Sequence, residues 1–175
     1  LELLEKGVGK KITIVEKGSA VEDRVCPKQK SGLCASCKNC AITTGFSGAG
    51  AFSDGKLSLS SDVGGDLPEL IGRDVVEQLI SYTDGIYLRF GADEKIEGVS
   101  APDKIREIRK KAIKAGLKLV DCPIRHLGTE KARELYQAIE KYLIEKGVEI
   151  LFRTECKDLI INDGICSGAS VTSGG

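Results

Sequence analysis

The sequence predicts an α/β fold, in which helices alternate with strands that run parallel. One junction carries this prediction: helix-like residues, a glycine and then a β-rich run, found at Gly7, Gly116 and Gly147. A glycine just past a helix adopts the left-handed conformation that ends it, so a strand can follow after a short turn. The composition agrees, because 41% hydrophobic and 30% charged residues are typical of a folded globular protein.

Three helices are predicted from apolar residues spaced three and four positions apart. The clearest has Thr129 as its N-cap and Glu130 in the first turn, where a negative charge is favourable. A second covers 102–115 and starts with Pro102, which suits a first helical position, and a third covers about 74–88. The residues expected to face inward are Ala132, Leu135, Ile139, Tyr142 and Leu143, then Ile105, Ile108, Ala112 and Ile113, and then Val75, Leu79 and Tyr82.

Strands are predicted after the three glycine junctions, at 11–15, 117–120 and 148–152. The tail, 154–172, predicts two β segments around Asn162-Asp163-Gly164, which is a strong hairpin signal. The stretch from 19 to 68 differs, since it is rich in Cys, Gly, Ser and Asp. A loop of this length is uncommon in a compact domain unless a ligand or metal organises it.

Charge and hydropathy restrict the partners that we expect. The formal net charge is zero, which gives no electrostatic reason to expect nucleic acid or an anionic membrane. No apolar run approaches 18 residues and no signal peptide opens the chain, so a cytoplasmic location is expected. The chain has no methionine and starts with residues typical of a helix end, so we expect a fragment of a longer protein. The oligomeric state is not predicted.

The first predicted strand ends in an acid, Glu16, followed by Lys17 and Gly18. In dinucleotide-binding folds the second strand ends this way, and its carboxylate binds the ribose hydroxyls. A glycine-rich phosphate loop lies about 20 residues earlier in such folds. Only 15 residues precede Glu16, so this loop would fall upstream of Leu1. The alternative is a strand that simply enters a turn.

The stretch from 45 to 56, GFSGAGAFSDGK, is the most distinctive in the sequence. Small residues let the backbone approach a flat ligand closely and leave N–H groups free to donate. Ser53, Asp54 and Lys56 add a hydroxyl, a carboxylate and a cation. The sequence therefore predicts a ligand contact here, with a mobile loop as the alternative.

Four cysteines, Cys26, Cys34, Cys37 and Cys40, are separated by seven, two and two residues. Two-residue spacings let thiolates converge on one ion, as in zinc and iron–sulfur sites, which this spacing does not distinguish. We predict that the four cysteines are metal ligands. The alternatives are a redox-active pair or free thiols in a surface loop.

The only histidine, His126, is the candidate catalytic acid or base, and its neighbour Arg125 could hold an anion. Gly128 and Thr129 then begin a helix, whose N-terminus favours anions. The alternative is that His126 only caps or packs at the start of this helix.

Taken in order, Glu16-Lys17-Gly18, the cysteine cluster, GFSGAGAFSDGK and the stretch PIRHLGT at 123–129 resemble one family. It is the bacterial and archaeal family of poorly characterised FAD-dependent dehydrogenases, also called NAD(FAD)-utilising dehydrogenases, in the glutathione-reductase-like flavoprotein class. The resemblance covers nearly the whole chain, although the opening glycine motif of the family is absent. It implies part of a FAD-binding Rossmann-like domain with an inserted mixed helical and β lobe.

The resemblance implies a FAD-dependent oxidoreductase that acts on a small-molecule substrate, with NAD(P)H as a further candidate cofactor. It implies a partial FAD-binding domain at 1–18, a cysteine-rich and glycine-rich flavin-contact loop at 19–60, an inserted substrate lobe at 61–124 and a return to the FAD-binding domain at 125–175. The implied FAD-binding residues are Glu16, Lys17, Gly48, Ala49, Gly50, Ser53, Asp54, Gly55, Lys56, Gly128 and Thr129.

Two other functions remain open from the sequence. One is a metal-stabilised binding module without redox chemistry, which depends on the four cysteines alone. The other is a flavin-dependent enzyme that modifies nucleic acid, against which the zero net charge argues.

Overall fold

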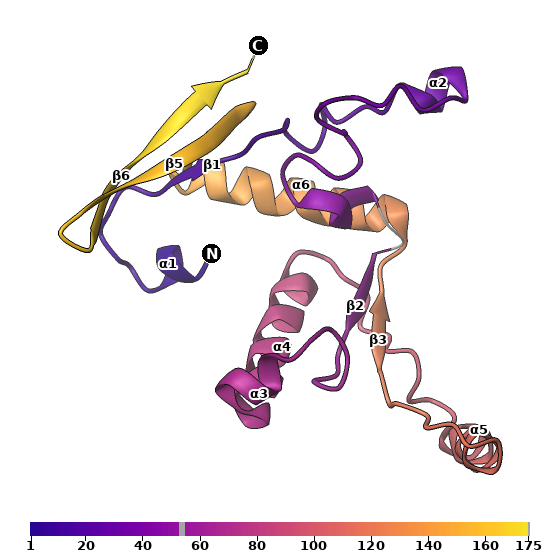
Figure 1. Cartoon of the computed structure of the whole chain (residues 1–175). Helices are drawn as coiled ribbons and strands as arrows, with labels where there is room; N and C mark the ends of the chain where they lie inside the picture. The colour runs from indigo at the N-terminus through magenta and orange to yellow at the C-terminus, as the bar shows by residue number, and fades with distance from the viewer. Residues whose placement is uncertain (53–54, 175) are drawn as a thin grey trace. The chain divides into compact units, whose positions relative to one another are not determined.

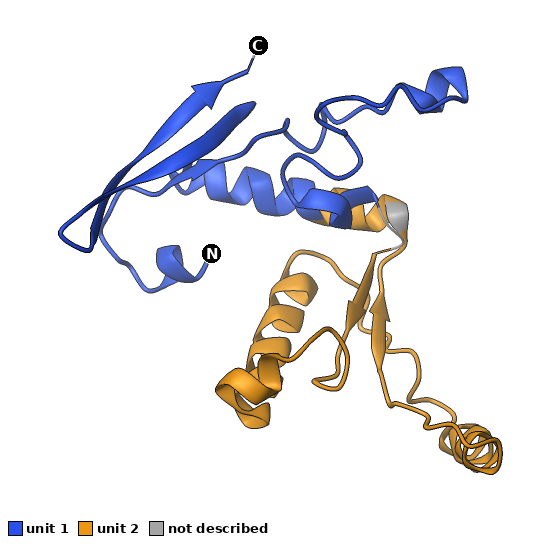
Figure 2. Cartoon of the chain, viewed as in Figure 1, with its two compact units in different colours: residues 1–52, 136–175 blue, residues 53–135 orange. Residues whose placement is uncertain are grey.

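The chain forms two compact units of mixed helix and strand, in a computed structural model that describes residues 1–52 and 55–174. The first unit contains residues 1–52 and 136–175, and the second contains residues 53–135 (Figure 2). Among the described residues the strands pair into three two-stranded sheets, one of them parallel. The structure is therefore α/β in the broad sense that the sequence predicts.

The first unit is built around one helix, a parallel strand pair and a long hairpin (Figure 1). Its elements in chain order are α1 (Glu2–Glu5), β1 (Thr13–Val15), α2 (Lys28–Ser31), the 3-10 helix η1 (Gly48–Phe52), α6 (Thr129–Glu145, of which the unit holds the part from Tyr136), β4 (Glu149–Leu151), β5 (Thr154–Asn162) and β6 (Ile165–Ser173). Ile14 of β1 lies opposite Ile150 of β4. The predicted strands at 11–15 and 148–152 are confirmed, each in a shorter form.

The predicted hairpin is also confirmed. Asn162 pairs with Ile165 across a two-residue turn, in which Asp163 and Gly164 have positive φ angles of 52° and 77°. Two positive φ angles match the right-handed twist of the flanking strands, which explains why Asp-Gly is favoured in such a turn. The hairpin lies beside β1 in the first unit (Figure 1).

Helix α6 buries the apolar stripe that its spacing predicts. Ala132, Leu135, Ile139 and Leu143 are buried, and Tyr142 is half-buried. Gly147 follows the helix with a φ of 84°, and the next residues form β4. The predicted sequence of helix, glycine and strand is therefore confirmed at this junction.

One acid, Glu140, is buried on α6, where its Oε2 accepts a hydrogen bond of 3.0 Å from the Val21 N–H. Burial raises the pKa of Glu140 above its ordinary 4.5, and the Val21 bond opposes this only in part. Because the pKa of Glu140 is higher in the folded than in the unfolded chain, the fold favours the protonated carboxyl. This favourable contribution to folding is complete below pH 4.5 and is lost as the pH rises through the folded-state pKa.

We therefore expect Glu140→Gln to become more stable relative to the wild type as the pH rises from 4.5 to about 7. Glutamine keeps an oxygen acceptor for Val21 but carries no charge to desolvate. Urea unfolding at the two pH values measures the difference. Equal pH dependence in both proteins would contradict the prediction.

Among its described residues, the second unit contains three complete helices, the first part of α6 and a short antiparallel strand pair. Its complete elements are β2 (Lys56–Ser58), α3 (Leu67–Ile71), α4 (Arg73–Arg89), α5 (Pro102–Lys114) and β3 (Ile124–His126). In the strand pair, Lys56 lies opposite His126, Leu57 opposite Arg125, and Ser58 opposite Ile124. The predicted helices at 74–88 and 102–115 are confirmed.

The strand predicted at 117–120 is wrong. Residues 117–120 form no strand, and the β3 strand starts at Ile124 instead. Ile124 has partners on two sides, because it pairs with Ser58 of β2 and forms an isolated bridge with Glu97. Strand formation needs such hydrogen-bonding partners, so the local β propensity of 117–120 was not sufficient.

The inward-facing residues predicted for two helices are also partly wrong. On α4, Val75, Leu79 and Tyr82 are all more than 40% exposed, whereas Val76 is buried. On α5, Ile108 and Ile113 are more than half exposed.

Within the described residues, no helix is long and apolar enough to span a bilayer.

Candidate functional site

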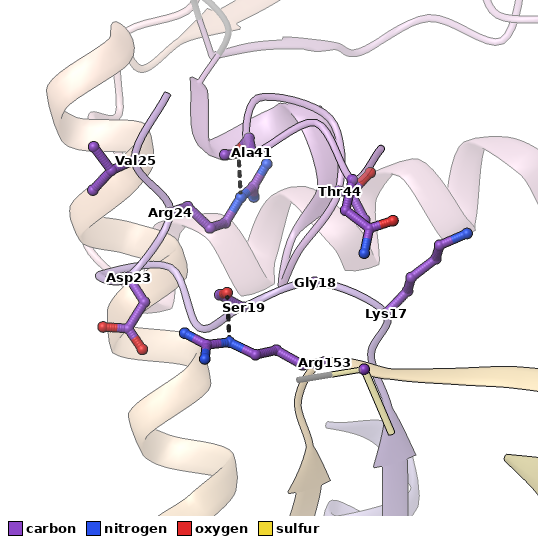
Figure 3. Close-up of a pocket in the computed structure, with 11 residues that line it drawn as sticks. Lys17, Gly18, Ser19, Asp23, Arg24, Val25, Ala41, Thr44 and Arg153 are labelled. Atoms are coloured by element: carbon purple, nitrogen blue, oxygen red, sulfur yellow. Dashed lines mark hydrogen bonds between the residues drawn. The ribbon is translucent and has the colours of Figure 1, made fainter. Parts of the chain in front are cut away.

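The strongest candidate site is a polar pocket of about 250 Å³ in the first unit (Figure 3). Lys17 follows β1 and Arg153 follows β4, so the pocket lies at the carboxyl ends of two parallel strands. In open α/β sheets, ligands bind outside the carboxyl ends of the strands. The residues that line the pocket are Lys17, Gly18, Ser19, Asp23, Arg24, Val25, Asn39, Ala41, Thr44, Arg153 and Gly174.

Glu16 is held beside this pocket by backbone bonds on both sides. Its N–H donates to Leu151 O at 3.0 Å, and its carbonyl accepts from the Thr154 N–H at 2.9 Å. Its Oε1 accepts a hydrogen bond of 2.7 Å from the Gly18 N–H. Among the predicted cofactor residues, Lys17 lines the pocket, whereas Glu16 lies next to it along the chain.

The start of the glycine-rich stretch packs directly on the end of the first strand. A Cβ on Gly18 would lie 2.5 Å from Gly45 N, so this approach requires glycine at 18. Gly45 has a φ of 130°, and the Phe46 N–H donates to Ser19 O at 3.1 Å. The end of the first strand and the start of the glycine-rich stretch, which are predicted to bind one dinucleotide, therefore lie in contact within the first unit.

Further along this stretch, Gly48–Phe52 form η1, which contains the predicted residues Gly48, Ala49 and Gly50. A Cβ on Gly50 would lie 2.7 Å from the hydroxyl oxygen of Tyr136 on α6, so a larger residue here would force the Tyr136 ring to move. Predicted residues Ser53 and Asp54 lie outside the described residues.

A buried arginine, Arg24, holds the wall of the pocket. Its guanidinium donates to the carbonyls of Ala41, Ile42 and Phe46 at 2.9, 2.8 and 2.8 Å. It also stacks over the Phe52 ring at 4.4 Å, and only 2% of the residue is exposed. Sequence reasoning missed Arg24, because no spacing or motif marks an arginine whose partners are backbone carbonyls.

The four cysteines of the cluster do not converge. Cys34, Cys37 and Cys40 are exposed, Cys26 is half-buried, and all are free thiols. Within the described residues, no group of three or more His, Cys, Asp or Glu side chains could hold a metal ion. A closed zinc site needs four converging ligands, so this geometry gives the predicted metal site no support.

Cys40 nevertheless has a distinct environment. The pKa of Cys40 is lowered, first by the Ile42 backbone N–H, then by the Thr43 hydroxyl and the Thr43 backbone N–H, which favour the thiolate. A lowered pKa increases the thiolate fraction at neutral pH, and the thiolate is the nucleophile.

We expect iodoacetamide at about pH 7 to alkylate Cys40 faster than Cys34 or Cys37, which are also exposed. Mass spectrometry of peptides from a time course measures the three rates. Thr43→Val keeps the size of the side chain but removes the hydroxyl, so it should slow the reaction of Cys40 alone. Equal rates for the three thiols would contradict the prediction.

The remaining predicted residues lie in the second unit. Lys56 and His126 are opposite each other in the β2–β3 pair, and both are exposed. The Gly55 carbonyl accepts from the Leu127 N–H at 2.9 Å, and Gly128 has a φ of 74°. The side chain of Thr129 lies outside the described part of the chain.

The guanidinium of Arg125 is engaged inside the second unit. It donates through Nε and Nη2 to the two carboxylate oxygens of Asp84, the second at 2.7 Å, and through Nη1 to Asp93 O. The side chain of Arg125 is 3% exposed and that of Asp84 15%. This arrangement fits a structural ion pair better than an open anion-binding group.

The geometry therefore offers the polar pocket at the strand ends of the first unit and, in the second, an exposed Lys56–His126 pair beside the buried Arg125–Asp84 ion pair. Neither a protein-family model nor a curated protein sequence matches this chain.

Proposed function

We propose that the first unit binds the adenosine end of FAD and that the chain is part of a FAD-dependent oxidoreductase. The observation that carries the proposal is the polar pocket at the carboxyl ends of β1 and β4, beside an acid at the end of β1. Nucleotides bind at this edge of α/β sheets, and an acid at the strand end accepts hydrogen bonds from ribose.

The residues present fit such a ligand. The Glu16 carboxylate accepts through two oxygens, so it can accept a ribose hydroxyl as well as the Gly18 N–H. Ser19, Asn39 and Thr44 give the pocket hydroxyl and amide groups, and Lys17 gives it a positive charge. The glycine-rich stretch contacts the same strand end, which supports one ligand-binding region rather than two.

FAD, when bound, would supply the hydride chemistry, and the protein would hold and orient it. In the second unit, His126 is exposed and its imidazole could move a proton, whereas Arg125 is engaged by Asp84. The metal-stabilised binding module is not proposed further, because the described cysteines do not gather.

The proposal is tested by titrating the purified chain with FAD and following flavin fluorescence, with circular dichroism to confirm folding. We expect Glu16→Gln to weaken binding by about tenfold, because it removes the charge that accepts from ribose. Gly18→Ala should abolish binding, because its Cβ would collide with Gly45. Gly85→Ala on α4 is the control, since a Cβ there meets nothing within 4 Å.

A folded wild-type chain that does not bind FAD would contradict the proposal. Equal affinity in the wild type and Glu16→Gln would contradict the ribose role of Glu16.

A further inference from the structure

A second polar pocket, of about 240 Å³, adjoins the candidate site and shares Lys17, Asn39, Arg153 and Gly174 with it. Its other lining residues are Lys38, Glu155, Lys157 and Thr172. Four of the side chains are cationic and one is a carboxylate. Lys38 and Lys157 line only this second pocket, and neither has a role in the proposed FAD site.

Glu155 fixes two of the cations. Lys17 Nζ lies 2.9 Å from Glu155 Oε1, and Lys157 Nζ lies 2.6 Å from Oε2. These two ammonium groups lower the pKa of Glu155 to about 2, so it is charged at neutral pH. One negative charge therefore orders two lysines and leaves the pocket with an excess of positive charge.

Arg153 has a backbone conformation that is unusual for an arginine. Its φ is 52°, in the left-handed region that favours glycine. Its N–H donates to Gly18 O at 2.7 Å, and its carbonyl accepts from the Gly174 N–H at 2.7 Å. Backbone strain of this kind occurs at functional sites, where the side chain serves a purpose that glycine could not.

Arg153 lines both pockets, and its side chain reaches toward Ser19 of the candidate site (Figure 3). Its Nε donates to Ser19 Oγ at 3.3 Å (Figure 3). Arginine binds phosphate through parallel N–H groups, and lysine adds point charges. The strained arginine and the paired lysines are thus the side chains that phosphate recognition needs.

We propose that Arg153, Lys17, Lys38 and Lys157 form a subsite for a terminal phosphate group, either a monoester or inorganic phosphate, beside the nucleotide pocket. The inference goes beyond the proposed function, because FAD carries no terminal phosphate group. Its two phosphates form the internal pyrophosphate bridge, and its adenosine ribose is not phosphorylated. The phosphate group comes either from a ribose-phosphorylated adenine nucleotide or from free inorganic phosphate.

The experiment is calorimetric titration of the full chain, at low ionic strength, with 2′,5′-ADP, 5′-AMP and inorganic phosphate. Arg153→Gly is the main variant, because glycine adopts a φ of 52° without strain and removes the side chain that carries the guanidinium. We expect it to fold normally and to bind 2′,5′-ADP about tenfold or more weakly. Lys157→Gln should weaken binding in the same direction.

Asp163→Gly is the matched control. Asp163 has the same φ of 52° but lies in the β5–β6 turn, outside both pockets. The Asp163→Gly variant should bind every probe with the affinity of the wild type.

Either of two results would support the subsite. In the first, 2′,5′-ADP binds more tightly than 5′-AMP; in the second, inorganic phosphate binds by itself. In both cases, Arg153→Gly must weaken the binding. The first identifies a ribose-linked phosphate and the second a free one. The inference is overturned if no phosphate probe binds the wild type, or if Arg153→Gly binds as the wild type does. FAD affinity is measured separately in each protein, so a failure of the FAD proposal is distinguishable from a failure of the subsite.

Discussion

Replacing Arg24 with alanine is expected to destabilise the first unit by about 4 kcal/mol, because hydrogen bonds to a charged group contribute about 1.5–3 kcal/mol each and are not fully additive. Three carbonyls, those of Ala41, Ile42 and Phe46, lose their donor. The Phe52 ring also loses its cation partner.

Urea unfolding measures the loss, and hydrogen exchange locates it. Amides from 41 to 47 should lose protection in Arg24→Ala even where the remainder of the unit stays folded. Arg24→Lys is informative, because an ammonium keeps the charge but lacks the planar guanidinium that reaches three acceptors. Arg106→Ala, on the exposed side of α5, is the control.

A loss below about 1 kcal/mol in Arg24→Ala, which is the size of an ordinary substitution, would contradict the role assigned to this residue. The same outcome would weaken the nucleotide-pocket proposal, since Arg24 holds the wall that includes Ala41 and Thr44.

Replacing Asp84 with alanine is expected to destabilise the second unit by about 3–5 kcal/mol, because it leaves a buried arginine without its counter-ion. Asp84 accepts from two nitrogens of Arg125, whose side chain is 3% exposed. The carboxylate also raises the pKa of Arg125, so the guanidinium stays charged and has to be compensated.

The double variant Asp84→Leu with Arg125→Met should recover most of this stability, because an apolar pair of similar volume has no charge to desolvate. Asp121→Ala is the control, since its partner Arg109 is 42% exposed and such pairs contribute about 0–1 kcal/mol. Chemical denaturation of the four proteins gives the comparison. The ion-pair interpretation fails if Asp84→Ala and Asp121→Ala lose the same amount.

The sequence was most informative where structure depends on neighbours along the chain. The stripe of α6 and the turn at Asp163-Gly164 follow from helical periodicity and from residues that accept positive φ. The sequence also marked Lys17 and the glycine-rich stretch, which lie at the pocket and beside it.

The sequence was least informative where structure depends on a distant partner. Residues 117–120 have β propensity but form no strand, whereas Ile124 pairs with Ser58 and Glu97. Val76, rather than Val75, is buried on α4, because the face of a helix that is buried depends on what packs against it.

By itself, then, the sequence determined the main helices, the strands that became β1 and β4, the hairpin and a strand end with an acid, whereas the pairing of β1 with β4 came from the structure. Only the tertiary structure decided that Arg24 and Arg153 belong to the pocket and that Arg125 is committed to Asp84. The physical reason is that these arginines bind groups far away along the chain, or backbone groups that every residue has. Neither kind of partner leaves a spacing that a sequence can display.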